Sequence, residues 1–147
     1  MTVTIIQSTH DWLLISADFP NFTAQELFSY FTQADLLPKW WSPNVPELDL
    51  SVGGKYHLEW STMNWHLRGT YKAVEANKIV AFTWKWDHTP ELPMRNVCVM
   101  FNHREDGGAS LMIIHGTYGD DETEQNDRQA HLDGWTHFLG QLQMVKA

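Results

Sequence analysis

Hydrophobic and polar residues alternate along most of the chain between residues 54 and 117. In the segment GGKYHLEW, Tyr56, Leu58 and Trp60 alternate with charged or polar residues. Successive side chains of a β-strand point to opposite faces, so this period of two predicts a strand with one apolar face. The same alternation predicts strands over residues 12–18, 65–74, 78–86, 95–103 and 109–117.

Short turns separate several of the predicted strands. Ala76-Asn77 interrupts one alternating stretch, and Asp106-Gly107-Gly108 is typical of a tight hairpin. Strands joined by such turns pair with their neighbours in antiparallel fashion. The pattern therefore predicts an antiparallel meander, and we expect its markedly aromatic face to be the concave one.

The end of the chain changes to a helical period. In HLDGWTHFLGQL (131–142), Leu132, Trp135, Leu139 and Leu142 recur three and four residues apart. Residues at this spacing lie on one side of a helix. Acidic residues precede the segment, where they suit the positive end of a helix dipole. We expect a long amphipathic helix that packs across the sheet.

A shorter helix is predicted near the N-terminus. Thr23 and Glu26 form a capping box, in which the hydroxyl and the carboxylate each pair with a free backbone amide. Phe22 and Leu27 stand where a hydrophobic staple would pack. These signals predict a helix that begins near Ala24.

Thr32 is expected to start a second short helical turn that stops near Pro38. The chain is thus predicted to be a single α+β domain over residues 1–147, with two short helices near the N-terminus and a curved antiparallel sheet wrapped around a long C-terminal helix. With 147 residues it is long enough to bury most of its apolar surface.

Composition excludes several classes of function. The formal net charge is -8 with only ten Lys and Arg, so binding to nucleic acid or to an anionic membrane is not expected. No run approaches the roughly 18 apolar residues of a membrane span, and MTVTIIQSTHDW lacks a basic leader followed by an apolar stretch. We expect a cytoplasmic protein. Cys98 is the single cysteine and is interpreted as structural.

Five stretches of the sequence match one known pattern in their order and spacing. They are LLPKWWSP, DLSVGGKYHLEW, RGTYKAVEANKIVAFTWKW, EDGGASLMIIHGTY and HLDGWTHFLGQL. Together they resemble the family of the activator of the ninety-kilodalton heat-shock protein ATPase, within the wider START-like (SRPBCC, polyketide-cyclase and pollen-allergen) superfamily. The resemblance implies a helix-grip fold, often with a hydrophobic cavity between sheet and helix. It also implies a chaperone partner as an alternative, although eukaryotic-type activators look like longer chains with an additional N-terminal domain.

If the alternation assigns the faces correctly, an aromatic set of side chains points inward. Eight Trp and seven Phe suit an apolar cavity with a few polar tips, although such rings also fill solid cores. We expect a cavity that binds an apolar or aromatic metabolite or lipid, the alternative being a completely packed interior. The candidate ligand-binding residues are Tyr56, Leu58, Trp60, Trp65, Leu67, Tyr71, Phe82, Trp84, Trp86, Val99, Phe101, Leu111, Ile113, His115, His131, Trp135, Phe138 and Leu139.

His115 and His131 are the candidates for acid–base chemistry, because imidazole titrates near neutral pH. No Asp or Glu falls on the inward strand face, so neither His has an obvious carboxylate to orient it. A buried His that bonds to a backbone carbonyl is the competing interpretation. We therefore assign no catalytic residue and expect a binding protein more than an enzyme.

The remaining motifs do not change this interpretation. No HExxH or paired-His spacing occurs, so we expect no metal and no cofactor. Trp40-Trp41 is expected to be buried against the first helix, with a cavity cap or a surface patch as alternatives. Gly134 is interpreted as a close approach between helix and sheet, or else a surface position.

Three classes of function remain. A small-molecule binding module requires only the cavity and is favoured. A co-chaperone-like protein of the stress response would use the outer surface. An enzyme of the cyclase, dehydratase or hydrolase type would need polar groups that converge inside the cavity.

Overall fold

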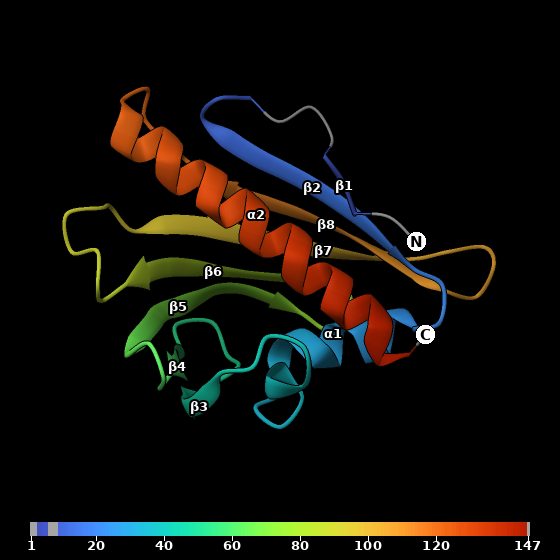
Figure 1. Ribbon diagram of the computed structural model, residues 1–147. Coiled ribbons are helices and arrows are strands. Elements are labelled where there is room, and N and C mark those ends of the chain that lie inside the picture. The colour runs from blue at the N-terminus through green and yellow to red at the C-terminus, as the bar shows by residue number, and fades with distance from the viewer. Residues whose placement is uncertain (1–2, 6–8, 147) are drawn as a thin grey trace.

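The computed structural model describes residues 3–5 and 9–146. In this part of the chain, eight strands form one antiparallel sheet, and a long helix lies across one face of it (Figure 1). In chain order the elements are β1 (Val3–Ile5), β2 (Trp12–Phe19), α1 (Ala24–Thr32), the 3₁₀ turn η1 (Leu37–Lys39), β3 (Asn44–Leu48), β4 (Lys55–Trp60), β5 (Trp65–Glu75), β6 (Ile79–Trp86), β7 (Arg95–His103), β8 (Ala109–Gly116) and α2 (Glu122–Val145).

The spatial order of the strands is β1-β2-β8-β7-β6-β5-β4-β3. Strands β4 to β8 thus form the predicted meander, and β2 closes onto β8 from Trp12 to Phe19. All six predicted strands are confirmed. The hairpin at Asp106-Gly107 is also present, with Gly107 at a φ of +88° that favours glycine.

Strands β1 and β3 were not predicted. Strand β3 (NVPEL) contains Pro46 and has no clean alternation, and its register with β4 shifts between Asn44 and Glu47. It is the edge strand next to β4, where a proline without an N–H is tolerated. A short, irregular edge strand of this kind carries little periodic signal.

The predicted start of α1 is confirmed in detail. The Thr23 Oγ1 atom accepts a hydrogen bond from the Glu26 amide at 3.1 Å, and the Thr23 amide donates to Glu26 Oε1 at 2.9 Å. The predicted second helix near Thr32 was placed wrongly. Thr32 is the last residue of α1, where its hydroxyl donates to the Phe28 carbonyl oxygen at 2.9 Å. Only η1 follows, and Pro38 lies inside it because proline suits a first helical turn.

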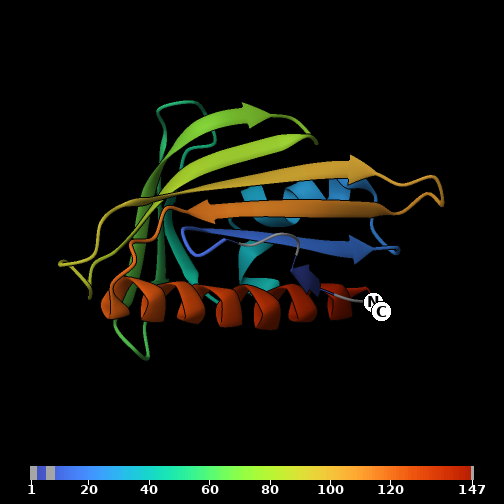
Figure 2. The same ribbon diagram turned by 90° about the horizontal axis from the view of Figure 1, so that it is seen from above.

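Helix α2 runs along the concave face of the sheet, and the strands curve around it when seen from above (Figure 2). Asp121 caps its N-terminus, where Oδ1 accepts from the Glu124 amide at 2.9 Å. Trp135, Leu139 and Leu142 of the predicted stripe are buried against the sheet, while Leu132 is half-buried. This arrangement is a helix-grip α+β fold, as the sequence predicted.

Candidate ligand-binding cavity

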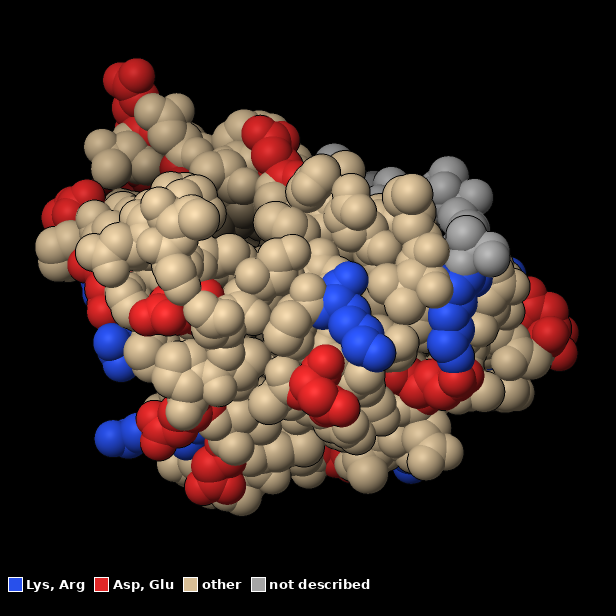
Figure 3. Space-filling view, turned by 60° about the horizontal axis from the view of Figure 1, so that its bottom comes forward, with Lys and Arg blue, Asp and Glu red and all other residues tan. Residues whose placement is uncertain are grey.

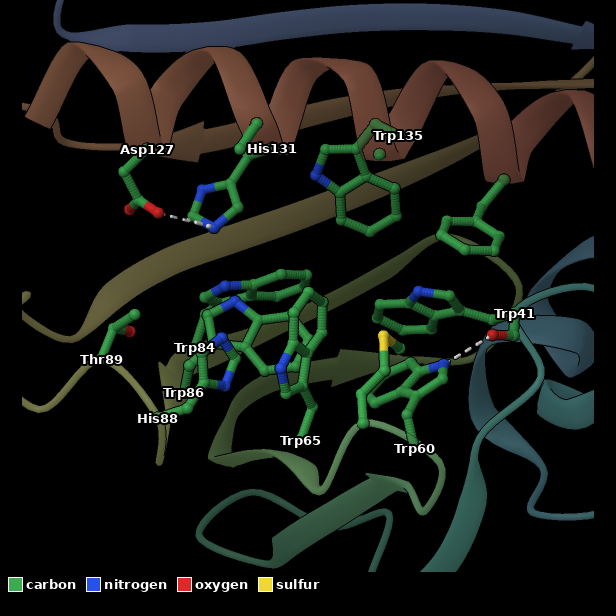
Figure 4. A pocket seen from close by; sticks show the side chains of 14 residues that line it. Trp41, Trp60, Trp65, Trp84, Trp86, His88, Thr89, Asp127, His131 and Trp135 are labelled. Carbon is green, nitrogen blue, oxygen red and sulfur yellow. Dashed lines mark hydrogen bonds and ion pairs between the residues drawn. The ribbon is translucent and has the colours of Figure 1, made fainter.

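A cavity of about 290 Å³ lies between the N-terminal half of α2 and the Trp-rich ends of β4, β5 and β6 (Figure 4). Its size is near the lower end of the roughly 300–1,000 Å³ typical of small-molecule sites. The side chains around it come from well-separated segments of the chain. The lining residues are Trp41, Trp60, Met63, Trp65, Trp84, Trp86, His88, Thr89, Asp127, Ala130, His131, Gly134, Trp135 and Phe138.

Six of the eight tryptophans of the chain form most of the wall. Trp41 stacks on Trp84 with ring centroids 5.8 Å apart, and Trp60 meets Trp41 edge to face at 5.4 Å. Trp86 lies nearly perpendicular to Trp84, at 88°. Because each ring is fixed by its neighbours, the aromatic wall is a rigid assembly.

The loop before β3 contributes the far side of the wall. Trp60 Nε1 donates to the Trp41 carbonyl oxygen at 2.9 Å, which ties this loop to β4. The neighbouring Trp40 instead packs on α1, where its Nε1 donates to the Tyr30 carbonyl oxygen at 2.8 Å and its ring lies 4.8 Å from Phe31. Burial against the first helix is thus confirmed for Trp40, whereas Trp41 faces the cavity.

A buried cluster of charges holds the start of α2 beside the cavity. Arg95 of β7 is 2% exposed, and its guanidinium contacts Glu124 at 2.9 Å and Asp127 at 2.7 Å. The guanidinium also lies 4.2 Å from the centre of the Tyr118 ring. We call Arg95, Glu124 and Asp127 the Arg95 cluster. Because Asp127 lines the cavity, the cluster brings charge to its edge.

His131 stands next to this cluster and also lines the cavity. Its Nδ1 lies 2.8 Å from the Tyr118 hydroxyl, and its Nε2 lies 3.5 Å from Asp127 Oδ1 (Figure 4). Since the carboxylate has no proton to give, this geometry favours a proton on Nε2, with the Tyr118 hydroxyl donating to Nδ1. Burial lowers the pKa of His131 to about 4, against the opposing effect of the Asp127 carboxylate. A neutral imidazole of such low basicity is poorly matched to general-base work at neutral pH.

His115 lies deeper than expected and does not line the cavity. It is fully buried, and Trp135 Nε1 donates to its Nδ1 at 3.0 Å. Its ring stacks on that of His131 at 4.7 Å, and burial holds the pKa of His115 well below its usual value. The expected backbone-carbonyl partner is found for neither His, since their partners are Trp135, Tyr118 and Asp127.

The expectation that no carboxylate orients these histidines was wrong for His131. It considered only the strands, whereas Asp127 comes from α2 itself, four residues before His131. Residues at that spacing lie on the same side of a helix. The spacing of Asp127 and His131 was therefore a usable sequence signal, but it lies one helical turn before the apolar stripe that begins at Leu132.

Seven of the eighteen candidate ligand-binding residues line the cavity, all of them aromatic or imidazole side chains. They are Trp60, Trp65, Trp84, Trp86, His131, Trp135 and Phe138. The other eleven face inward but pack in the solid core or around a small void of about 20 Å³, so they do not line the large cavity. These eleven are Tyr56, Leu58, Leu67, Tyr71, Phe82, Val99, Phe101, Leu111, Ile113, His115 and Leu139.

Tyr56 shows why an inward polar tip need not reach the cavity. Its hydroxyl crosses β5 and donates to the Thr83 carbonyl oxygen of β6 at 2.6 Å. Gly69 of β5 makes this crossing possible, because a Cβ there would lie 2.4 Å from the Tyr56 ring. The Tyr56 hydroxyl is therefore hydrogen-bonded within the sheet and does not reach the cavity.

Seven lining residues were not among the candidate ligand-binding residues, although a cavity cap was one alternative for Trp41. They are Trp41, Met63, His88, Thr89, Asp127, Ala130 and Gly134. Most lie in loops or on the flank of α2, where no alternation marks an inward face. The interpretation of Gly134 as a close approach was wrong. Nothing lies within 4 Å of a Cβ built at Gly134, and the residue borders the cavity.

Within residues 3–5 and 9–146, no group of three or more His, Cys, Asp or Glu side chains is placed to hold a metal ion. His57 and His66 are half-buried, and the His57 Nε2 and His66 Nδ1 atoms lie 2.8 Å apart. No helix of the described residues has the length and apolar character needed to cross a membrane.

The fold and the cavity define the class of this protein as a helix-grip domain with an aromatic cavity under its C-terminal helix. The family model described as "Activator of Hsp90 ATPase homolog 1-like protein" matches residues 21–145, and the chain belongs to this family. No curated protein matches the sequence.

Solved structures with the same fold come from several organisms. A protein from Arthrobacter aurescens has a TM-score of 0.80 at 16% identity, over 99% of this chain and 91% of that one. An HSP90 activator from Plasmodium falciparum has a TM-score of 0.77 at 22% identity, over 92% and 95% of the two chains. A Rhodobacter sphaeroides protein has a TM-score of 0.77 at 17% identity, over 97% and 96%. At these identities the similarity shows a shared fold.

Proposed function

We propose that this protein binds a small apolar or aromatic molecule in the cavity under α2. The observation that carries the proposal is the cavity of about 290 Å³ whose wall contains six Trp rings. Natural interiors otherwise close to high density, so a hollow of this size among large rigid rings is a feature to be explained.

The chemistry of the wall supports an apolar guest with limited polarity. Trp41, Trp60 and Trp84 offer indole rings that gain free energy when a ligand displaces water from them. Polar groups gather at one end, where His88, Thr89, Asp127 and His131 lie. A ligand with one apolar body and one polar end fits this division.

Gly134 offers a direct test of the cavity. The substitution Gly134→Leu introduces a side chain into free space beside the cavity, since no atom lies within 4 Å of the Cβ position. We expect this variant to fold and to lose binding. Gly140→Leu is the matched control, because Gly140 is also a helical glycine with open space around its Cβ but does not line the cavity.

Binding would be measured by intrinsic tryptophan fluorescence against a library of lipids and small aromatic compounds. Because six Trp line the cavity, a bound ligand should quench or shift the emission of the wild-type protein and of the Gly140→Leu variant. The signal should disappear in Gly134→Leu. If no compound changes the wild-type emission, the proposal of small-molecule binding is wrong.

A second candidate function is binding to a chaperone of the ninety-kilodalton heat-shock class. The family description and the name of the Plasmodium falciparum structure both support it. Isothermal titration calorimetry with a purified chaperone of this class tests the candidate. Absence of heat at micromolar concentrations of both proteins would remove it without affecting the cavity.

A further inference from the structure

The lining of the cavity has a marked asymmetry of charge. None of its fourteen residues is Lys or Arg, and Asp127 is the single Asp or Glu among them. Burial holds the pKa of His131 at about 4, so that this imidazole is neutral. The cavity therefore presents indole rings and one carboxylate.

Asp127 shares the Arg95 guanidinium with Glu124. Arg128, the other cation that acts on the adjoining Tyr118, donates to the Thr9 and Trp12 carbonyl oxygens and does not line the cavity. Arg95 binds Asp127 through Oδ2, at 3.0 Å from Nε and 2.7 Å from the terminal nitrogen, while Oδ1 is turned toward His131.

The charged groups that act on His88 at the rim of the cavity are Asp127, Asp87 and Glu91. Asp87 is paired with Arg68 at 3.0 Å, and Lys85 donates to the Thr89 carbonyl oxygen at 3.3 Å. In the space-filling view, uncharged side chains form most of the face, and both acidic and basic side chains lie along its left edge (Figure 3). The chain as a whole has a net charge of -8, which attracts cations toward this surface.

The cavity is surrounded by indole rings in several orientations. Trp84 and Trp86 are inclined by 88°, and Trp41 and Trp60 by 65°. The face of an indole ring carries negative electrostatic potential and attracts a cation within about 6 Å of its centre.

From the aromatic wall, the absence of basic lining residues and the Asp127 carboxylate in the lining, we propose that the cavity selects a hydrophobic ammonium cation. The ligand class is a quaternary ammonium or a protonated tertiary amine carried on a small apolar body. The inference rests on the proposed function, since it names the class of molecule that the same cavity takes. The ammonium end would lie near Asp127, with the apolar body among the Trp rings.

A matched pair of ligands separates this inference from simple apolar binding. Benzyltrimethylammonium and neopentylbenzene have nearly the same shape, and only the first is charged. A purely apolar cavity favours the neutral compound, because the cation loses its hydration on entry. A cavity that selects cations reverses the order. Benzylsulfonate supplies an anion with the same aromatic body.

Dissociation constants of the three compounds would be measured by tryptophan fluorescence and calorimetry on the full chain. We expect the cation to bind about tenfold tighter than the neutral compound, and the anion not to bind measurably. If the neutral compound binds as tightly or tighter, the inference is wrong while the proposed function stands. If none of the three binds but another compound does, the inference is again wrong. If nothing binds at all, both fail.

Asp127→Asn tests the role of the carboxylate without a change of shape. We expect it to weaken binding of benzyltrimethylammonium at least fivefold more than it weakens binding of neopentylbenzene, and the midpoint of thermal denaturation reports on folding. Asp133→Asn is the control, because it removes the same charge from an exposed position of α2 outside the cavity. Equal effects of the two substitutions would overturn the role assigned to Asp127.

Quaternary ammonium groups occur both on free metabolites and on lipid headgroups. The volume of about 290 Å³ suits a small free cation, and we expect no binding to phosphatidylcholine vesicles in a flotation assay. Flotation that benzyltrimethylammonium reverses would identify the lipid headgroup as the source of the same cation and support the site. Flotation that the cation does not reverse would contradict its specificity.

Discussion

The interior of this protein has two halves that share one sheet and one helix and yet differ in packing. In the packed half, around Leu139 and Leu142 of α2, side chains fill the space between helix and sheet, and Phe28 and Phe31 of α1 meet Phe101 of β7 at 5.4 Å. In the open half, between residues 127–135 of α2 and the Trp-rich strand ends, the cavity remains.

Two differences account for the contrast. Along α2, Ala130 and Gly134 in the open half give way to Leu139 and Leu142 in the packed half, so the helix contributes less volume near its N-terminus. In addition, α1 and η1 lie against the packed end of the sheet, as Figures 1 and 2 show, and nothing equivalent covers the open end in the described residues. Large rings alone therefore do not make a solid core. Ala130 and Gly134 on the facing helix are too small to fill the space that the rings enclose.

The largest expected effect concerns the attachment of α2 over the open half. Arg95→Met removes the guanidinium and leaves Glu124 and Asp127 close together, so we expect a loss of roughly 3–5 kcal/mol in unfolding free energy. Urea denaturation measures it. Arg68→Met is the control, since the Arg68–Asp87 pair is about half exposed and should contribute less than about 1 kcal/mol. Similar losses in both variants would show that the Arg95 cluster does not anchor the helix.

The packed half should respond to truncation through stability alone. Leu139→Ala creates a void in a fully buried site, so we expect a loss of about 3 kcal/mol with ligand binding retained. Phe138→Ala, one residue earlier and half-buried at the cavity, should lose less stability and weaken binding instead. Denaturation and fluorescence titration of both variants test the contrast. If the two variants behave alike, the division into halves fails.

Acid should weaken the open half before the carboxylates titrate. The pKa of His131 is about 4 in the folded protein against an ordinary value of 6.5, so the unfolded chain binds the additional proton between these values. The free energy of unfolding that neutral His131 contributes above pH 6.5 is therefore lost as the pH falls toward 4. The loss is about 2 kcal/mol between pH 6.5 and 5. Burial lowers the pKa of His115 in the same direction.

Denaturation midpoints across this pH range provide the measurement. A variant with His131→Asn should show a flatter profile between pH 6.5 and 5, because one of the titrating groups is gone. An unchanged slope would mean that His131 is not held neutral by the fold.

The smallest expected effect is a gain in stability. Gly134→Ala should add about 1 kcal/mol, since alanine favours the helix and its methyl group meets no neighbouring atom. Gly140→Ala should behave alike for the same reason. Thermal denaturation tests both. A loss of stability in Gly134→Ala alone would mean that this side of α2 is packed against the sheet and not open.

Much of the fold was predictable because its signals are local. The alternation of Tyr56, Leu58 and Trp60 correctly assigned a buried face, and the capping box at Thr23 correctly placed the start of α1. The weak signals failed where tertiary contacts replace periodicity. Strand β3 has an irregular register with β4. The Thr32 hydroxyl donates to the Phe28 carbonyl oxygen within α1 and does not start a new helix.

The cavity was less predictable than the fold. A side chain must face inward to line the cavity, but facing inward is not enough. Phe82, Trp84 and Trp86 were all predicted to face inward, yet only the two tryptophans line the large cavity. Asp127 has no strand partner to mark it, and its importance arises from Arg95, which is 32 residues away in sequence.

The sequence by itself determined which segments form strands and helices and which of their faces turn inward, since a period of 2 or 3.6 is a property of neighbouring residues. Only the tertiary structure decided where along that inward face the interior stays hollow and which charge stands at its edge. The volume left between helix and sheet depends on side chains from four distant segments at once. The combined volume of these side chains cannot be predicted from the periodicity of any single segment.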